Sequence, residues 1–220
     1  IDPTAFAARI ESTERDRLRA MLGVGPDQLL VGTVSCLKPQ KSPEDFVRVA
    51  ALVCQRVPAA RCVLVGDGAL RPKVEALLLE QGLQDRVTLL GWRRDVAALL
   101  KAFDVFVLTS QWEGLPCAIL EARASRIPIV ATRVGGAAEA IVEGIQGTLC
   151  PAGDVRAMAE RVCQILEDER FRVDLRTGTQ ELPEEFTIQE TLKQYQSLYA
   201  YLLHATRPSE DVMKLQPNRL

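Results

Sequence analysis

The sequence contains very little histidine, no closely paired cysteines and no excess of charge of either sign. Its one histidine, His204, lies near the C-terminus, so this chain alone cannot form a serine-hydrolase triad or a histidine-based metal site. The 27 Lys and Arg residues nearly balance the 29 Asp and Glu residues, for a net charge of −2. No basic field therefore points to a nucleic-acid partner. We expect a protein without a metal, a cofactor or bound nucleic acid.

The six cysteines lie at positions 36, 54, 62, 117, 150 and 163, and no two of them have the C-x-x-C spacing. This argues against a zinc ribbon and against a thioredoxin-type redox pair. Most of the cysteines stand inside apolar runs, which is typical of small buried side chains in a reducing compartment. We therefore expect a cytoplasmic protein.

No segment approaches the roughly 18 consecutive apolar residues that a membrane-spanning helix needs. The first residues, Ile1–Pro3, lack the basic and apolar regions of a signal peptide. They also lack an initiating methionine, which indicates a processed or truncated chain. We expect that this chain has no transmembrane segment. Peripheral association of the full-length protein with a membrane stays open.

Apolar residues make up 47% of the 220 residues, enough for a substantial core. Many stand in short runs rich in β-branched residues, as expected for strands buried on both faces. These runs are Leu29–Leu37, Arg61–Val65, Val87–Leu90, Val105–Thr109, Ile129–Ala131 and, more weakly, Gly147–Cys150. The helical segments between them are Pro43–Arg56, Arg71–Gln81, Asp95–Phe103, Pro116–Ser125 and Ala137–Val142. The alternation predicts an α/β fold with a Rossmann-like, doubly wound parallel sheet of about six strands.

The last third of the chain changes to helices alone. They are predicted at Val155–Glu167, Arg170–Gly178 and Thr187–Leu203. The last of these helices has an apolar stripe for docking, formed by Tyr195, Leu198, Tyr199 and Leu202. We expect one domain over residues 1–204, followed by a flexible tail at 205–220.

Glycines and charged residues collect just after the carboxyl ends of the predicted strands. In chain order they are Lys38 and Lys41, Gly66–Gly68, Gly91–Arg94, Glu113–Pro116 and Gly135–Gly136. A single glycine pair marks any turn between a strand and a helix. Five such loops with lysines and carboxylates among them favour a ligand crevice, which forms at this edge of a doubly wound sheet.

The first of these loops carries cations instead of a glycine-rich fingerprint. No G-x-G-x-x-G or Walker A motif follows the first strand, which argues against a dinucleotide or P-loop site. Lys41 stands just before the predicted helix start at Pro43, with Ser42 as N-cap, where backbone N–H groups favour anions. A lysine there suits a diphosphate, although a solvated surface lysine explains it equally well.

The segment Glu113–Glu121 carries the sharpest signal. Pro116 suits the first position of a helix, and the amides near 115–118 would then form a second anion seat. The two carboxylates are too far apart to share a proton, but a carboxylate can accept hydrogen bonds from two vicinal hydroxyls. They predict contacts with a ribose and with sugar hydroxyls. The alternative is a loop charge and an exposed helix position.

Glu113–Pro116 followed by Glu121–Ala122 resembles the E-x7-E signature of glycosyltransferase family 4, whose members have the GT-B fold. Further stretches that resemble the family are Leu37–Lys41, Val65–Gly68, Leu90–Trp92, Asp104–Val107, Pro128–Thr132, Val134–Gly136 with Glu139, and Phe186–Thr187. The resemblance extends from Ile1 to Leu203.

The resemblance implies the donor-binding half of a retaining, metal-independent glycosyltransferase in glycan or exopolysaccharide synthesis. Its donor would be a nucleoside diphosphate sugar, either a UDP-sugar or a GDP-sugar. The acceptor would be held by an N-terminal domain of the same enzyme that is absent from this chain. The isolated chain is therefore expected to be inactive.

Family roles carry over to matching positions. Lys41 would hold the diphosphate, assisted by the amides of Gly114 and Leu115. Glu113 would bind the donor sugar, and Glu121 the ribose. With Lys41 and Glu113 as catalytic residues, the expected substrate site comprises Lys38, Lys41, Gly66, Arg93, Glu113, Gly114, Leu115 and Glu121.

Two positions depart from the family pattern. Cys36 stands where an arginine is common five residues before the lysine, and Lys38 would supply the missing charge. Ser42 stands where glycine often follows the lysine. Two other functions stay open, a sugar-nucleotide epimerase of GT-B shape and a non-catalytic nucleotide-binding module.

Overall fold

The computed structural model describes residues 1–8, 10–178 and 182–205. The chain divides into two compact units, of which the larger spans Pro3–Leu182. The smaller unit combines Ile1–Asp2 with the chain from Pro183 onward. The expected tail, 205–220, lies outside the described residues except for Ala205, which ends the last helix. The single domain over 1–204 stays a prediction.

The larger unit is built on a six-stranded parallel sheet, which confirms the predicted fold class. Its strands are β1 (Leu29–Val34), β2 (Ala60–Val65), β3 (Val87–Gly91), β4 (Val105–Leu108), β5 (Ile129–Thr132) and β6 (Gly147–Cys150). They pair in the order β3-β2-β1-β4-β5-β6. The chain thus builds one half outward from β1, returns to the middle, and builds the other half outward from β4, which is the doubly wound topology.

The first strand is shorter than the sequence predicts. It ends at Val34, whereas the apolar run continues to Leu37. Beyond the strand the Leu37 N–H donates to the carbonyl of Asp67 at 3.0 Å, in the loop that follows β2. The Leu37 side chain is fully buried in the core beneath the helices, not in the sheet. The apolar run therefore continues to Leu37 because this side chain is buried, not because the strand extends that far.

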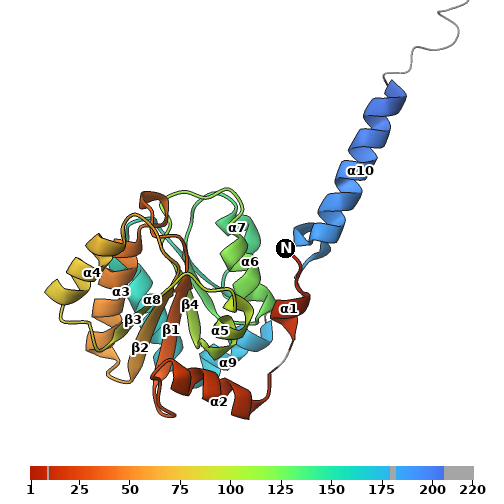
Figure 1. Ribbon diagram of the computed structural model, residues 1–220. Helices are drawn as coiled ribbons and strands as arrows, with labels where there is room; N and C mark the ends of the chain where they lie inside the picture. Colours follow the sequence, from red (N-terminus) through yellow and green to blue (C-terminus); the bar gives the residue numbers. More distant parts are fainter. Residues whose placement is uncertain (9, 179–181, 206–220) are drawn as a thin grey trace, which may run out of the picture. The chain divides into compact units, whose positions relative to one another are not determined.

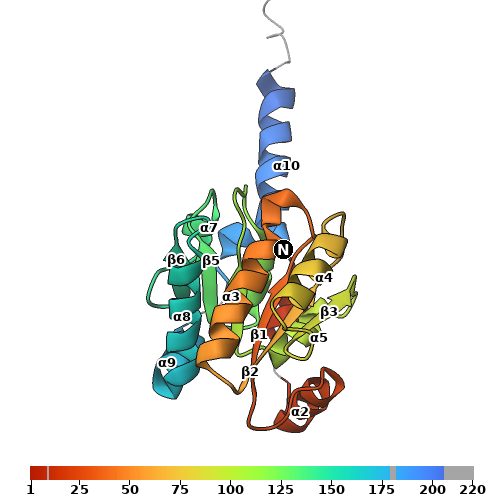
Figure 2. The same cartoon turned by 90° about the vertical axis from the view of Figure 1, so that its left-hand side faces the viewer.

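Helices cover both faces of the sheet (Figure 1, Figure 2). One face is covered by α3 (Pro43–Arg56), α4 (Arg71–Glu80) and α8 (Val155–Glu167), the other by α5 (Val96–Ala102) and α6 (Cys117–Ala124). The short α7 (Ala137–Ala140) packs against α6, and α9 (Glu169–Gly178) packs against α8. On the first face α3 and α8 lie against each other and bury Phe46, Val53, Met158 and Val162 in the main core.

Two helices that the sequence analysis does not predict precede the sheet, α1 (Thr4–Ala7) and α2 (Ser12–Met21). Helix α2 is mostly polar, and its Met21 side chain is 78% exposed. It lacks the apolar stripe of an amphipathic helix, so no periodic signal marks it in the sequence.

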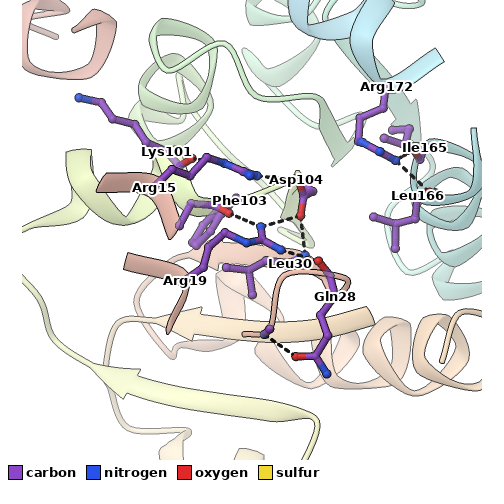
Figure 3. A network of polar contacts seen from close by, with 12 residues as sticks. Arg15, Arg19, Gln28, Leu30, Lys101, Phe103, Asp104, Ile165, Leu166 and Arg172 are labelled. Carbon is purple, nitrogen blue, oxygen red and sulfur yellow. Dashed lines mark hydrogen bonds and ion pairs between the residues drawn. The ribbon is translucent and has the colours of Figure 1, made fainter. Parts of the chain in front are cut away.

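Charged groups fasten α2 to the residue that precedes β4 (Figure 3). The buried Asp104 carboxylate accepts from Arg15 at 2.8 Å, from Arg19 at 2.9 Å and from the Leu30 N–H at 2.8 Å. Arg19 also donates to the carbonyl of Ala102 at 3.0 Å. Burial by itself would raise the pKa of Asp104, but the Leu30 amide and the two arginines outweigh it and hold that pKa below its ordinary value. A shared carboxylate thus replaces apolar packing as the anchor of α2.

The smaller unit contains a 3₁₀ turn at Glu184–Phe186 and the helix α10 (Ile188–Ala205). The N–H of Ile188 donates to the carbonyl of Ile1 at 2.9 Å, which ties the first residues of the chain to this unit. On α10 the rings of Tyr195 and Tyr199 stack with their centroids 6.3 Å apart. The predicted docking role of this stripe stays a prediction. None of the described helices, α10 included, is long and apolar enough to cross a membrane.

Candidate functional site

The strand order places the topological switch point of the sheet between β1 and β4. At this point the sheet reverses its direction of growth, so the loop after β1 and the loop after β4 leave toward opposite faces. The loop after β1 includes a 3₁₀ turn at Pro39–Lys41, and the loop after β4 contains Glu113. These two loops carry the strongest candidates from the sequence, and the fold makes them neighbours.

Lys41 and Glu113 are in direct contact. The Lys41 Nζ atom lies 2.5 Å from Glu113 Oε1, and the two side chains are only 16% and 5% exposed. Ser110 Oγ donates to the same carboxylate oxygen at 2.5 Å, and Gln40 Nε2 donates to the other at 3.4 Å. The Glu113 carboxylate is therefore held from both oxygens and is charge-balanced by a single lysine.

Backbone contacts fix the two loops to each other. Thr109 Oγ1 donates to the carbonyls of Lys41 and Ser42, both at 3.0 Å. The Gln111 N–H donates to the carbonyl of Gln40 at 2.7 Å. The sequence analysis missed Gln40, Thr109 and Ser110, because a polar side chain after a strand gives no signal until its partner is known.

Ser42 is the N-cap residue of α3, as predicted, but its side chain makes no capping hydrogen bond to the backbone. Instead Ser42 Oγ donates to Asp45 Oδ2 at 2.7 Å, and Gln111 Nε2 donates to the same oxygen at 3.1 Å. Ser42 has φ of 43°, in the left-handed region that favours glycine. A glycine at this position would adopt the same backbone conformation without steric cost.

Glycines let neighbouring loops approach one another closely at this edge of the sheet. Gly135, after β5, has φ of 47°, and a Cβ built on it would lie 1.9 Å from the Glu113 carbonyl oxygen. Gly66, after β2, has φ of 136°, and its Cβ would lie 1.9 Å from the Ser35 carbonyl oxygen. A side chain at either place would push the loops after β4 or β1 out of position.

The helix after Glu113 begins one residue later than predicted. Pro116 is the N-cap of α6 with ψ of 106°, not its first helical residue. In the part of the chain that the structure describes, the N–H groups of Gly114 and Leu115 donate no hydrogen bond. Together with the free amides of the first helical turn, they supply donors that suit an anion.

Glu121 lies in the middle of α6 and is half-buried. Among the described residues no group donates a hydrogen bond to its carboxylate. Burial raises the pKa of Glu121 above its ordinary value. Burying a carboxylate without hydrogen-bond donors destabilises the folded chain. A bound ligand with hydroxyl groups would donate to the carboxylate and offset this desolvation free energy.

Replacing Glu121 with glutamine is expected to stabilise the unliganded chain at neutral pH. The pKa of Glu121 is raised in the folded state. At a pH below the ordinary pKa of a glutamate, residue 121 is uncharged in both the wild type and the variant, so the two are expected to be equally stable. As the pH rises through the raised pKa, the wild type loses stability relative to the variant. Melting temperatures of the wild type and the variant, measured from pH 4 to pH 8, check this expectation. The control is Glu75→Gln, which replaces an exposed carboxylate of α4. A variant that melts at or below the wild type at pH 8 would contradict the cost assigned to Glu121.

The remaining predicted residues are spread along the same edge. Lys38 is exposed, and within the described residues its side chain has no partner. Cys36 is exposed as well. Arg93 follows β3, which is separated from β1 by β2, and its guanidinium donates to Asp95 at 2.8 and 2.6 Å. The structure thus brings Lys41, Glu113 and the following amides together but keeps Arg93 apart from them.

Across the described ranges, no three His, Cys, Asp or Glu side chains are grouped as they would be to hold a metal ion. The six cysteines are all unpaired, and four of them are buried, namely Cys54, Cys62, Cys150 and Cys163.

Comparison with known proteins identifies the family of the chain. Residues 14–182 match the family model described as glycosyl transferases group 1. The chain is 31% identical over 184 residues to N-acetyl-alpha-D-glucosaminyl L-malate synthase of Bacillus anthracis, which covers 83% of this chain and 48% of that protein. It is 29% identical over 202 residues to UDP-Gal:alpha-D-GlcNAc-diphosphoundecaprenol alpha-1,3-galactosyltransferase of Escherichia coli, covering 90% and 52%.

Solved structures of Anabaena Alr3699/HepE also resemble the chain. The complex with UDP and glucose superposes with a TM-score of 0.80 at 26% identity, over 90% of this chain and 55% of that one. The complex with UDP-glucose gives a TM-score of 0.79. The chain spans about half the length of the curated relatives it matches. On the extent of the family match, this chain belongs to the group 1 glycosyltransferases.

Proposed function

We propose that the chain is the donor-binding half of a retaining glycosyltransferase in glycan or polysaccharide synthesis. It moves a sugar from a nucleoside diphosphate sugar, either a UDP-sugar or a GDP-sugar, to an acceptor. The observation that carries the proposal is the contact between Lys41 and Glu113 at the switch point of the sheet. Lys41 supplies a cation for the phosphates, and Glu113 beside it supplies a carboxylate for the sugar hydroxyls. In a nucleoside diphosphate sugar, the diphosphate and the sugar are likewise adjacent.

The roles follow from the charges of the donor. A diphosphate needs positive partners, which Lys41 and the unpaired N–H groups of Gly114 and Leu115 provide. Glu113 holds Lys41 in place, so the charge of Lys41 is already positioned for a diphosphate. As the bond between sugar and phosphate breaks, negative charge builds on the leaving diphosphate, and the same groups stabilise it.

Glu113 keeps its position when Lys41 turns to phosphate. Ser110 and Gln40 donate to its two oxygens from the loops on either side. Its carboxylate then accepts hydrogen bonds from hydroxyls of the donor sugar. Glu121, which has no hydrogen-bond donor among the described residues, accepts from the two hydroxyls of the ribose.

The comparisons support this assignment. The similar Anabaena protein is described in complexes with UDP and with UDP-glucose. Relatives about twice as long as the matched region leave room for an acceptor-binding domain. We place the acceptor site on such a domain, and we expect the present chain alone to bind the donor without transferring it.

Glu113→Gln tests the proposal. The amide keeps the shape of the side chain but removes the negative charge beside Lys41. Binding of UDP or GDP is therefore expected to be unchanged or tighter. The added affinity that the sugar of a nucleotide sugar provides is expected to fall about tenfold, since one hydrogen bond to a charged group contributes roughly 1.5–3 kcal/mol. Titration calorimetry with each nucleotide and its sugar conjugate measures both effects.

The control is Glu75→Gln, which removes an exposed carboxylate on α4 that pairs with Arg71. It is expected to bind all ligands as the wild type does. If the wild type binds none of the nucleotides at millimolar concentration, the proposed function is wrong. An equal loss of bare nucleotide and of nucleotide sugar in Glu113→Gln would overturn the role given to Glu113.

A further inference from the structure

A pocket opens at the edge of the sheet opposite Lys41 and Glu113, where β4 and β5 begin. It has a volume of about 330 Å³, within the range of small-molecule sites. Its walls come from α1, the first turns of α2 and the ends of α5, α6 and α9. All of these segments belong to the larger unit. The crevice with Lys41 lies past the other ends of the strands, so the two sites are separate.

Among the residues that the structure describes, four cationic side chains and no carboxylate line this pocket. They are Arg15, Lys101, Arg126 and Arg176. Apolar residues of the wall include Phe6, Ile10 and Ile127. A pocket with this composition attracts an anion that carries an organic group.

The nearby acidic group does not neutralise these charges. Asp104 is shared between Arg15 and Arg19, one guanidinium to each oxygen (Figure 3). One negative charge therefore faces two positive charges before the other cations of the pocket are counted. Burial and the positive charge of Arg15 lower the pKa of Arg176 below its ordinary value, in keeping with an excess of positive charge.

Several polar groups at the pocket lack partners. The Nε of Arg176 and the Oγ of Ser125 are buried without a hydrogen bond within the described residues. Arg176 Nη2 donates to the carbonyl of Phe103 at 2.8 Å, and Lys101 Nζ donates to the carbonyl of Ala5 at 3.1 Å. The exposed guanidinium of Arg126 makes no hydrogen bond or ion pair with any described residue. Buried donors without partners are rare, and their clustering here indicates a site that a ligand completes.

We propose that this pocket binds a phosphate ester. Guanidinium groups match phosphate because their planar N–H groups donate in pairs to its oxygens. Ser125 and Arg176 line the same pocket, and its apolar wall takes the organic part of the ester. Two sources share this chemistry, a soluble phosphorylated metabolite and the headgroup of an acidic phospholipid. The site lies apart from the donor crevice and therefore regulates or anchors the domain without taking part in the transfer.

Arg126→Gln tests the site, because this exposed side chain makes no hydrogen bond or ion pair with the described residues, so that the substitution is expected to leave the fold intact. The control is Arg156→Gln, which removes an equal charge from an exposed position of α8 outside this pocket. Both are made in a Lys41→Ala background, so that anions at the donor crevice do not contribute. The probes are inorganic phosphate, glycerol 3-phosphate, and phosphatidylcholine vesicles with or without phosphatidylglycerol. Calorimetry and vesicle sedimentation measure binding.

Arg126→Gln is expected to weaken binding about tenfold, while Arg156→Gln leaves it unchanged. If the effect is seen with the soluble probes, the ligand is a metabolite. If it is seen only with phosphatidylglycerol vesicles, the ligand is a lipid headgroup. Failure of the unaltered pocket to bind any probe, or an equal effect of the two arginine substitutions, overturns the proposal.

Discussion

Replacing Asp104 with asparagine is expected to lower the free energy of unfolding by about 3–5 kcal/mol, the usual cost of breaking a buried ion pair on one side. The amide leaves Arg19, which is only 6% exposed at its side chain, without a counter-charge. It also turns an acceptor for Arg15 or the Leu30 N–H into a donor. Because whole domains are stable by only about 5–15 kcal/mol, this is a large part of the total. Urea unfolding followed by circular dichroism measures the change.

The control for Asp104→Asn is Asp95→Asn, which breaks the exposed pair with Arg93 and is expected to leave the unfolding midpoint almost unchanged. The pKa of Asp104 is lowered in the folded state, so its stabilising effect is complete above its ordinary pKa. That effect is lost as the pH falls through the lowered value. The gap between wild type and variant should therefore be full at pH 7 and close in strong acid. A gap that does not depend on pH would show that Asp104 acts through packing and not through charge.

Lys41→Ala and Glu121→Ala are each expected to weaken binding of a nucleoside diphosphate by about tenfold to a hundredfold. Each substitution removes hydrogen bonds to a charged group, which contribute roughly 1.5–3 kcal/mol, and about 1.4 kcal/mol is a factor of ten. Lys41→Ala would remove the contact with the phosphates, and Glu121→Ala would remove the contact with the ribose. Calorimetric titration of the chain with UDP and GDP gives the affinities.

Lys73→Ala serves as the matched control for Lys41, since it removes an exposed lysine of α4 that pairs with Glu44. Its affinity for nucleotide is expected to equal that of the wild type. EDTA is expected to change none of these affinities, because the proposal assigns the phosphate charge to Lys41 and backbone amides. Unaltered binding by Lys41→Ala, or binding that requires a divalent cation, would overturn the assigned roles.

The sequence by itself determined the sheet and the edge at which the candidate site lies. Strands such as Val105–Leu108 and Ile129–Thr132 are buried on both faces, so a continuous run of apolar residues marks each of them. Glycines with positive φ, such as Gly66 and Gly135, are needed where loops pass close to one another. Both signals depend on the residue types within a short stretch of chain, so they can be recognised in the sequence without knowledge of the tertiary structure.

The tertiary structure alone decided which loops meet. The contact between Lys41 and Glu113 joins residues 72 apart in sequence and depends on β1 pairing with β4. The helix α2 likewise depends on Arg19 reaching Asp104, 85 residues away. Periodicity shows which side of an element is buried, but not which distant charge it faces. Strand order makes that choice, because it sets which chain segments become neighbours, and with them the partners of every polar side chain at the site.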